Sequence, residues 1–374
     1  MLSSCSKVYD PSIDTEQNML VVDGRITNKT DAYHVVLSST RPFTSSEKGA
    51  PVRGANVFVN DNLDNSYKFN ERDKGDYVSD SLQFTGQPGY TYRLHIITED
   101  GTEYDSDPQK IFPEVSPDNV YAEFDNEEIL NRVTGLKVNT HGASIFIDIR
   151  NQSDTLPRFR IISDLVFQYY NQEFIIIDEV NRVGYLFQYY CWKTVNFNPD
   201  FDLTGGENFL NSASVKKHPA CFMDDNYNVL AYPYKAIINM KDTTASAMET
   251  NEIGLQTIHH RILYLSQYTL NNESYLYYKS LNDQMQSEGK LFDPVAAQLT
   301  GNIKCISDPG KKAIGFFEAS SVSYSRYVVD LRNLENSQPR LIKEPYILPP
   351  EPDGCRIDRP GSNTHHNVPS FWIF

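Results

Sequence analysis

The sequence predicts a mainly β protein, with an N-terminal immunoglobulin-like antiparallel sandwich followed by a larger β-rich domain with one amphipathic helix. Three observations lead to this prediction. Short segments of alternating apolar and polar residues recur between turn residues over residues 18–110, as in β-sandwiches. Longer, aromatic-rich segments fill residues 119–330, and one stretch within them has its apolar residues at helical spacing.

Length and charge limit the classes of function. The chain has 374 residues, a net charge of -15 and 40% hydrophobic residues. At about 150 residues per domain, this length fits two domains. An acidic chain repels phosphate, so we expect no nucleic-acid partner. No apolar run approaches the roughly 18 residues of a membrane-spanning helix, so we expect no membrane crossing.

The first domain is expected to contain short strands in which alternate residues share a face. Tyr33, Val35 and Leu37 lie on one face of such a strand. Expected strands include residues 19–26, 33–39, 55–59, 66–70, 75–78 and 90–96. The domain lacks the Cys pair of antibody domains, so it is immunoglobulin-like in architecture only.

A proline-rich connector separates the two domains. Pro108, Pro113 and Pro117 keep it extended, because each proline fixes φ and removes a backbone donor. Expected strands of the second domain are residues 143–149, 158–162, 167–177, 184–192, 229–238 and 258–268. Residues 331–374 hold seven prolines and predict a loop-like C-terminal extension.

Residues 272–288 are the expected helix. Four apolar residues recur there at helical spacing: Tyr277, Tyr278, Leu281 and Met285. Asn271 or Asn272 can cap its N-terminus, and Gly289 follows its last turn. We expect this helix to lie against the sheet of the second domain.

Cys5 is a candidate lipid-attachment site. It follows Leu2 at the spacing seen where bacterial lipoprotein signals end, with two small residues between them. Four residues cannot supply the basic and apolar regions of a signal peptide. Either the true start lies upstream, or Cys5 is an ordinary residue near the terminus. Residues 1–17 are accordingly expected to form a tether, since residues 6–18 are polar and include Pro11.

Several segments, taken in order, resemble a known family. The N-terminal ones are MLVVDGRIT at 19–27, PVRGANV at 51–57, GQPGYTY at 86–92 and DGTEY at 100–104. The C-terminal ones are LSQYTL at 265–270, YLYY at 275–278, GKLFDP at 289–294, GNIKCISDP at 301–309 and IGFFEASSV at 314–322. Together they resemble DUF4249, a family of Bacteroidota outer-membrane lipoproteins.

The resemblance implies a cellular location and a kind of partner. It implies an exported protein, lipid-anchored in the outer membrane, whose partner is a SusC-type TonB-dependent transporter. The acidic run found after the lipid Cys in surface-displayed members is short here, with only Asp10, Asp14 and Glu16, so the periplasmic and cell-surface faces both stay open. We expect a non-catalytic binding or accessory subunit of an envelope complex. The alternative is a glycan- or peptide-capturing accessory for nutrient uptake.

The other four cysteines are candidates for disulfides. An oxidising envelope favours two bridges among Cys191, Cys221, Cys305 and Cys355, with three connectivities open. We favour Cys191–Cys221 and Cys305–Cys355, because each would tie a loop-rich segment to a strand. Metal binding is the competing interpretation, but no Cys-x-x-Cys element occurs.

An aromatic strip is the best candidate for binding. Its members are Tyr169, Tyr170, Tyr185, Tyr189, Tyr190 and Trp192. Exposed rings can stack on sugars or form a protein interface. Alternatively, alternate members line the core. Since Tyr169 and Tyr170 are neighbours, as are Tyr189 and Tyr190, one of each pair faces outward on a regular strand.

Catalytic and metal-binding motifs give no positive signal. There is no Gly-x-Ser-x-Gly elbow, His-Glu-x-x-His or phosphate-binding glycine loop, so we expect no catalytic residues, metal or cofactor. Oxygen ligands suited to calcium cluster at residues 60–64. The glycine and terminal glutamate of an EF-hand are missing there, and an Asx-rich hairpin turn accounts for the same residues.

Overall fold

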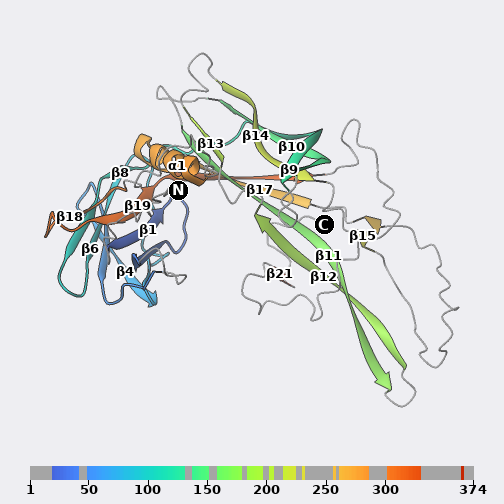
Figure 1. The fold of residues 1–374 in the computed structure, drawn as a ribbon, viewed down its shortest axis with the longest axis horizontal. Coiled ribbons are helices and arrows are strands. Elements are labelled where there is room, and N and C mark those ends of the chain that lie inside the picture. Colours follow the sequence, from blue (N-terminus) through green and yellow to red (C-terminus); the bar gives the residue numbers. More distant parts are fainter. Residues whose placement is uncertain are drawn as a thin grey trace, which may run out of the picture. The chain divides into compact units, whose positions relative to one another are not determined.

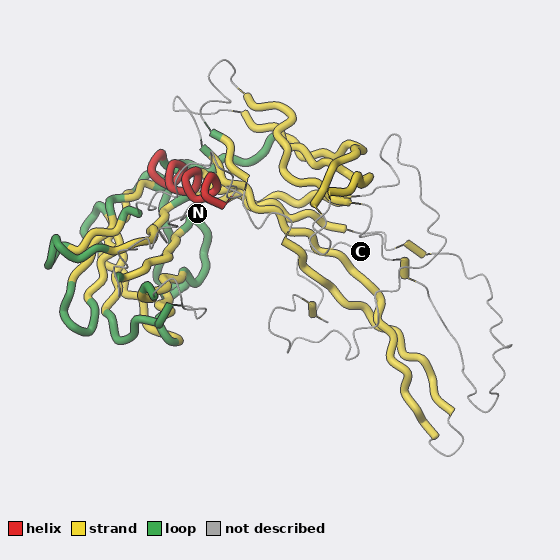
Figure 2. Tube along the Cα trace, viewed as in Figure 1, coloured by secondary structure: helices red, strands yellow, loops and turns green. Residues whose placement is uncertain are grey.

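The computed structural model is mostly β, with one α-helix in the part of the chain that it describes (Figures 1 and 2). The described residues are 19–41, 49–130, 137–150, 158–178, 183–196, 202–205, 214–224, 230–231, 256–257, 261–285, 301–329 and 364–365. The prediction of a mainly β protein beginning with an antiparallel sandwich is confirmed.

The chain divides into two compact units, and each is built from two segments. The first unit comprises Met1–Glu114 and Thr269–Val322. The second comprises Val115–Tyr268 and Ser323–Phe374. The first unit therefore contains the expected domain 18–110 together with a segment from much later in the sequence.

Ten strands form the first unit's sheet, which runs in the order β18-β7-β6-β3-β4-β5-β2-β1-β19, with β8 beside β6. Its early strands are β1 (Leu20–Ile26), β2 (His34–Ser39), β3 (Asn56–Asp61), β4 (Ser66–Asp73) and β5 (Asp76–Val78). The others are β6 (Thr91–Ile97), β7 (Glu103–Ser106), β8 (Gln109–Lys110), β18 (Ile303–Cys305) and β19 (Ala313–Ala319). β4 pairs with both β3 and β5 and so joins the two layers of the sandwich.

The two late strands complete this sheet. β19 pairs with β1 in parallel over its whole length, from Leu20 opposite Ala313 to Ile26 opposite Ala319. Asn302, just before β18, donates a hydrogen bond to the Phe317 carbonyl at 2.9 Å and accepts one from the Phe317 N–H at 2.9 Å. The Asn302 side chain thus forms the pair of hydrogen bonds that a neighbouring strand's backbone would form with Phe317. It links β18 to β19, the strands at the two ends of the sheet order.

The core of the first unit follows the alternation read from the sequence. Tyr33, Val35 and Leu37 are all buried, as predicted for one face of β2. The largest fully buried side chains of this unit include Tyr77, Tyr92, Phe69 and Phe317. Burying such aromatic side chains removes a large apolar area from water, which is the main force holding the two layers together.

The predicted helix is confirmed as α1 (Asn272–Met285), but the expected placement of it against the second domain's sheet differs from the structure. Asn271 is the cap, since its Oδ1 accepts a hydrogen bond from the Ser274 N–H at 2.7 Å. The Tyr277 ring stacks on Phe316 of β19, with 4.5 Å between ring centroids. Tyr278 donates a hydrogen bond to Glu318 at 2.5 Å. The helix packs on β19 because its aromatic face meets apolar residues there.

The second unit contains several separate sheets. One has the order β14-β10-β9, from Ser214–Asp224, Lys137–Arg150 and Asn119–Leu130. Another has the order β20-β17-β11-β12-β21, from Ser321–Val329, Arg261–Thr269, Phe159–Asp178, Val183–Asn196 and Thr364–His365, with β13 (Asp202–Thr204) beside β11. A small pair joins β15 (Leu230–Ala231) to β16 (Gln256–Thr257).

Two expected strands of the second unit merge into one. Residues 159–162 and 167–177 of these expected strands both belong to β11, which has 20 residues and pairs with β12 as a long antiparallel hairpin (Figure 1). Most of the expected strand 229–238 and of the extension 331–374 lies outside the described residues.

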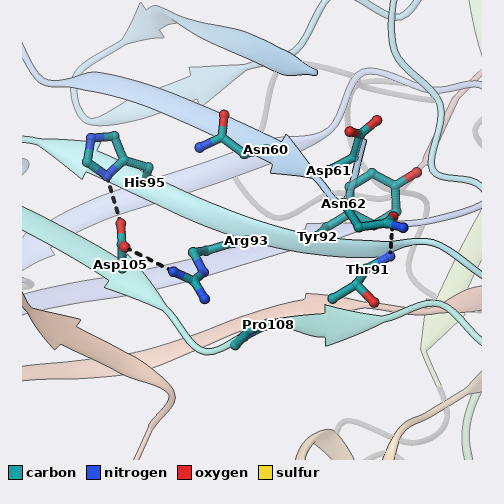
Figure 3. A pocket seen from close by; sticks show the side chains of 9 residues that line it. All are labelled: Asn60, Asp61, Asn62, Thr91, Tyr92, Arg93, His95, Asp105 and Pro108. Atoms are coloured by element: carbon teal, nitrogen blue, oxygen red, sulfur yellow. Dashed lines mark hydrogen bonds and ion pairs between the residues drawn. The ribbon is translucent and has the colours of Figure 1, made fainter. Parts of the chain in front are cut away.

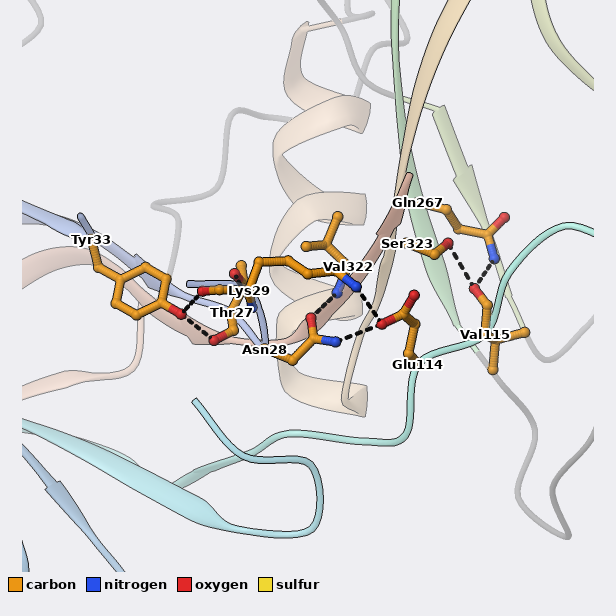
Figure 4. Close-up of polar contacts among 9 residues, drawn as sticks. All are labelled: Thr27, Asn28, Lys29, Tyr33, Glu114, Val115, Gln267, Val322 and Ser323. Atoms are coloured by element: carbon orange, nitrogen blue, oxygen red, sulfur yellow. Dashed lines mark hydrogen bonds and ion pairs between the residues drawn. The ribbon is translucent and has the colours of Figure 1, made fainter. Parts of the chain in front are cut away.

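Polar contacts hold the segments where the chain passes from one unit to the other (Figure 4). Within the first unit, Asn28 donates to the Glu114 carboxylate at 2.6 Å and accepts from the Val322 N–H at 2.7 Å. Within the second unit, the Val115 carbonyl accepts hydrogen bonds from Gln267 at 2.7 Å and Ser323 at 3.0 Å. Each unit therefore fixes its own ends of the connecting segments.

Candidate functional site

A polar groove lies on the outer face of the first unit's sheet. Its volume is about 490 Å³. It is lined by Asn60, Asp61, Asn62, Thr91, Tyr92, Arg93, His95, Asp105 and Pro108 (Figure 3). We call this set the β6 groove, because four of its nine residues belong to β6.

Strand alternation explains why Thr91, Arg93 and His95 face outward, although Tyr92 and Asp61, which also line the groove, are buried. The buried residues of β6 are Tyr92, Leu94 and Ile96. Thr91, Arg93 and His95 alternate with them and point to the other side of the sheet. The register sets Asn60 of β3 opposite Arg93, and Asp105 of β7 opposite His95. Three neighbouring strands thus bring their polar side chains to one place.

The charged groups of the groove are paired with one another. The Asp105 carboxylate lies 2.7 Å from Nδ1 of His95 and 3.5 Å from Nη1 of Arg93. The Arg93 side chain is 49% exposed, whereas the other two are less than a quarter exposed. Asp105 therefore offsets the positive charge of Arg93 and fixes the orientation of the His95 ring.

The Asp61 side chain stabilises the adjoining hairpin turn between β3 and β4. Its carboxylate accepts hydrogen bonds from the N–H groups of Leu63 at 2.8 Å and Asn65 at 3.0 Å, and from the Asn65 side chain at 2.9 Å. Tyr67 adds a fourth, from its hydroxyl, at 3.2 Å. Burial raises the pKa of Asp61, but these hydrogen bonds outweigh it and hold the pKa below its usual value.

These contacts decide between the two interpretations of residues 60–64. The oxygens of Asp61 are engaged by the turn itself, as an Asx-rich hairpin requires. Among the described residues, no group of three or more His, Cys, Asp or Glu side chains could hold a metal ion. The four hydrogen bonds to the Asp61 carboxylate are those of an Asx turn.

The His95–Asp105 pair has the spacing of a catalytic dyad, yet it recurs elsewhere. In the same unit, Nδ1 of His34 lies 2.8 Å from the carboxylate of Asp76, on β2 and β5 and away from the groove. Such pairs are cross-strand contacts that stabilise a sheet. Tyr92, whose hydroxyl accepts a hydrogen bond from the Gln87 N–H, is also no base, because burial raises its pKa to about 12. The arrangement is suited to holding a polar ligand.

The candidate cysteines fall partly outside the described residues, as Cys5 and Cys355 do. Cys305 is buried in β18, with its sulfur 3.7 Å from the Ser307 hydroxyl. Cys221 is half-buried in β14, opposite Ile145. Cys191 lies in β12, in a different sheet from Cys221, and its side chain is not described. Both disulfides and the lipid site therefore stay predictions.

The aromatic strip maps onto the β11–β12 hairpin. The ladder sets Tyr170 opposite Tyr190 and Tyr169 opposite Cys191. Trp192 is 4% exposed and packs with Val166 and Ile262, so it belongs to the core, as the packing alternative holds. Tyr185 and Tyr189 also lie in β12. The tyrosine side chains lie outside the described part, so their exposure stays a prediction.

The sequence interpretation did not single out Arg93, His95 and Asp105. The alternation in residues 90–96 does indicate that Arg93 and His95 point away from the core. What it does not give is the register that sets Asp105 opposite His95, because pairing depends on the turn at residues 98–102.

The fold and groove define a class: a β-sandwich protein with a polar groove on the sheet of its first unit. The chain belongs to the DUF4249 family, described as a domain of unknown function, whose model matches residues 6–326. No curated protein and no solved structure matches the chain. Within its described residues, the structure contains no helix long and apolar enough to span a membrane.

Proposed function

We propose that this protein is a non-catalytic Bacteroidota lipoprotein, anchored in the outer membrane through Cys5, that acts as a binding or accessory subunit of an envelope complex. Its partner in this proposal is a SusC-type TonB-dependent transporter. Support comes from membership of the DUF4249 family and from the Leu-x-x-Cys spacing that ends at Cys5.

One observation carries the binding role. The ionisable side chains of the β6 groove are engaged with each other or with backbone: Asp105 with His95 and Arg93, and Asp61 with its own turn. Groups whose orientation is fixed in this way present their remaining donors and acceptors in a set geometry, which suits the holding of a ligand.

Membrane fractionation tests the anchor. The full chain, expressed in a Bacteroidota host behind a lipoprotein signal sequence, is expected in the membrane fraction, and Cys5→Ser is expected in the soluble fraction. Ser6→Ala is the matched control, because it changes the neighbouring residue and leaves the Cys5 thiol in place. Equal membrane retention of Cys5→Ser would contradict the anchor.

Affinity purification from detergent-solubilised outer membrane tests the partner. The proposal expects a SusC-type transporter to be recovered with the tagged full chain. Recovery of the chain alone, under conditions in which the transporter is detected in the lysate, would count against the accessory role.

The same export proposal includes the disulfides Cys191–Cys221 and Cys305–Cys355. Alkylation under non-reducing conditions, followed by mass spectrometry of the exported chain, is expected to label none of these four cysteines. Two or more labelled cysteines would contradict the pairing. Burial protects Cys305 from the reagent, so the chain is denatured before labelling.

A second candidate function is the capture of a glycan or a peptide for uptake. It is favoured by the β6 groove, where polar side chains from three neighbouring strands converge and can hydrogen-bond to a polar ligand. A glycan array and a peptide array, both probed with the full chain, distinguish the two ligand classes. Absence of signal on both would remove this candidate.

A further inference from the structure

We propose that the β6 groove binds one ring of a neutral saccharide, with Asn60, Arg93 and His95 as the groups that recognise its hydroxyls. This inference rests on the second proposed function, ligand capture, and gives it a site and a ligand class.

Hydrogen-bonding capacity is the first argument. The Asn60 amide carries two donor hydrogens and an acceptor oxygen. Arg93 has five N–H donors, and the structure uses Nη1 at the long distance of 3.5 Å toward Asp105. His95 turns Nδ1 toward Asp105, so Nε2 is its second polar atom, on the other side of the ring. Donors and acceptors in this mixture suit adjacent hydroxyl groups, which need both.

The position of these groups is the second argument. Asn60 and Arg93 are register partners on adjacent strands, and His95 lies two residues further along β6 on the same face. All three side chains line the same groove, and Figure 3 shows them on neighbouring strands. Because all three stand on paired strands, their spacing is fixed before a ligand arrives, which reduces the entropy lost on binding.

Charge balance is the third argument and points to a neutral ligand. Asp105 offsets Arg93, and the Asp61 carboxylate already accepts four hydrogen bonds from its own turn. A phosphate or carboxylate in this groove would meet Arg93 but also the two aspartates. An anionic ligand therefore gains little electrostatic attraction here. A polyol can take the place of water on side chains whose charges are already paired.

Sheet topology argues against a peptide. One common way for an extended peptide to bind a β-sheet is to pair with a free strand edge. The strands under the groove have none: β3 lies between β6 and β4, β6 between β7 and β3, and β7 between β18 and β6. A peptide in the groove would leave its backbone groups without strand partners. Of the two ligand classes, glycan and peptide, the glycan is therefore favoured.

Saturation-transfer NMR of the full chain tests the proposal. The probes are the methyl glycosides of glucose, galactose, mannose and N-acetylglucosamine, with methyl glucuronide as the charged match for methyl glucoside and a short alanine peptide as the peptide probe. Dissociation constants are then measured for each probe that gives a signal.

At least one neutral glycoside is expected to bind, and to bind more tightly than the glucuronide and the peptide. Arg93→Ala is expected to weaken binding about tenfold or more, and Asn60→Ala about fivefold, since the first removes a charged donor and the second a neutral one. Arg72→Ala is the matched control. Arg72 also pairs with an aspartate, Asp76 at 3.4 Å, but lines no part of the groove.

Three outcomes would overturn the proposal: no neutral glycoside binds, binding is unchanged in both groove variants, or the glucuronide or the peptide binds more tightly than every neutral glycoside. Thermal unfolding of each variant confirms that the outward substitutions leave the fold intact. Transporter recovery in the affinity purification does not depend on these outcomes, so failure of the site and failure of the accessory role are distinguishable.

Discussion

Phe84 shows how one residue can organise the core of the first unit. Its ring contacts four others, with centroid distances of 5.5 Å to Tyr33, 4.2 Å to Tyr67, 6.1 Å to Phe69 and 5.9 Å to Tyr92. Phe84 belongs to no strand, and its side chain is only 4% exposed. Aromatic contacts of this kind add to the stabilisation from buried area.

Phe84→Ala is therefore expected to lower the free energy of unfolding by about 3–5 kcal/mol, because it leaves a cavity among four rings. Leu82→Ala is the matched control, two residues away and 93% exposed, and should change it by less than about 0.5 kcal/mol. Urea denaturation of the full chain measures both. Similar losses of unfolding free energy from the two substitutions would show that the packing of the core does not depend on Phe84.

Buried tyrosines make the first unit sensitive to alkali. Burial raises the pKa of Tyr92 to about 12 and raises the pKa values of Tyr33, Tyr67, Tyr77 and Tyr104. In the unfolded chain a tyrosine ionises near its ordinary pKa of about 10. The unfolded state therefore loses protons first as pH rises.

This difference predicts a stability that is fully present below pH about 10 and falls between about 10 and 12. Urea midpoints measured on either side of pH 10 check it. Tyr92→Phe should reduce the alkaline slope, at a cost of about 1 kcal/mol at neutral pH for the hydrogen bond lost from the Gln87 N–H. A midpoint that stays constant up to pH 12 would refute this linkage.

At the scale of elements, the parallel pair β1–β19 depends on Gly315. This glycine has φ of 102°, and a Cβ placed on it would lie 1.9 Å from the Val22 carbonyl oxygen. Gly101 is the matched case, with φ of 81° in the β6–β7 turn but no atom within 4 Å of its Cβ position. A side chain at either position would be strained by the positive φ, but only at position 315 would its Cβ also clash with a neighbouring strand.

Gly101→Ala is expected to cost about 1–2 kcal/mol from the left-handed backbone alone. Gly315→Ala should cost about 2–5 kcal/mol, because the strand must also move away from Val22. Thermal unfolding compares the two variants. Equal losses would mean that β19 shifts freely and that the close approach is unimportant.

The sequence predicted an element correctly where the pattern that defines it lies within the element itself. The alternation of residues 90–96 and the helical spacing of Tyr277 and Leu281 are local, and both elements were predicted correctly. The partner of β1 is not local, since nothing in AIGFFEA at 313–319 specifies a strand almost 300 residues earlier. The helix was placed on the wrong sheet for the same reason.

The groove follows the same rule. The Asx turn around Asp61 was one of two interpretations, and its hydrogen bonds join residues at most six apart. The meeting of Asn60, Arg93 and Asp105 requires the register of three strands. Composition and spacing contain no information about that register until the strands are paired.

At the scale of the molecule, the first unit is interrupted by Val115–Tyr268 and completed by Thr269–Val322. Residues 18–110 alone lack β18, β19 and α1, so β1 is left with an unpaired edge and Phe317 is missing from the core. The expected domain boundary would therefore give an incomplete fold.

Residues 18–114 joined by a short Gly/Ser linker to 269–322 are expected to fold, with dispersed amide NMR signals and cooperative unfolding. Residues 18–110 alone are expected to give neither. The discontinuous unit supplies every strand of the ten-stranded sheet, whereas the shorter fragment stops before its final two. A well-folded 18–110 fragment would refute this division.

The late arrival of β19 also has a consequence for synthesis. The hydrogen bond between Asn28 and Val322 joins residues 294 positions apart. At about 5–20 residues per second, a ribosome needs on the order of 15–60 s between them. The first strand to leave the ribosome is thus the last to gain both of its neighbours. Until β19 is available, the edge of β1 that β19 will cover stays open to pairing with strands of other chains.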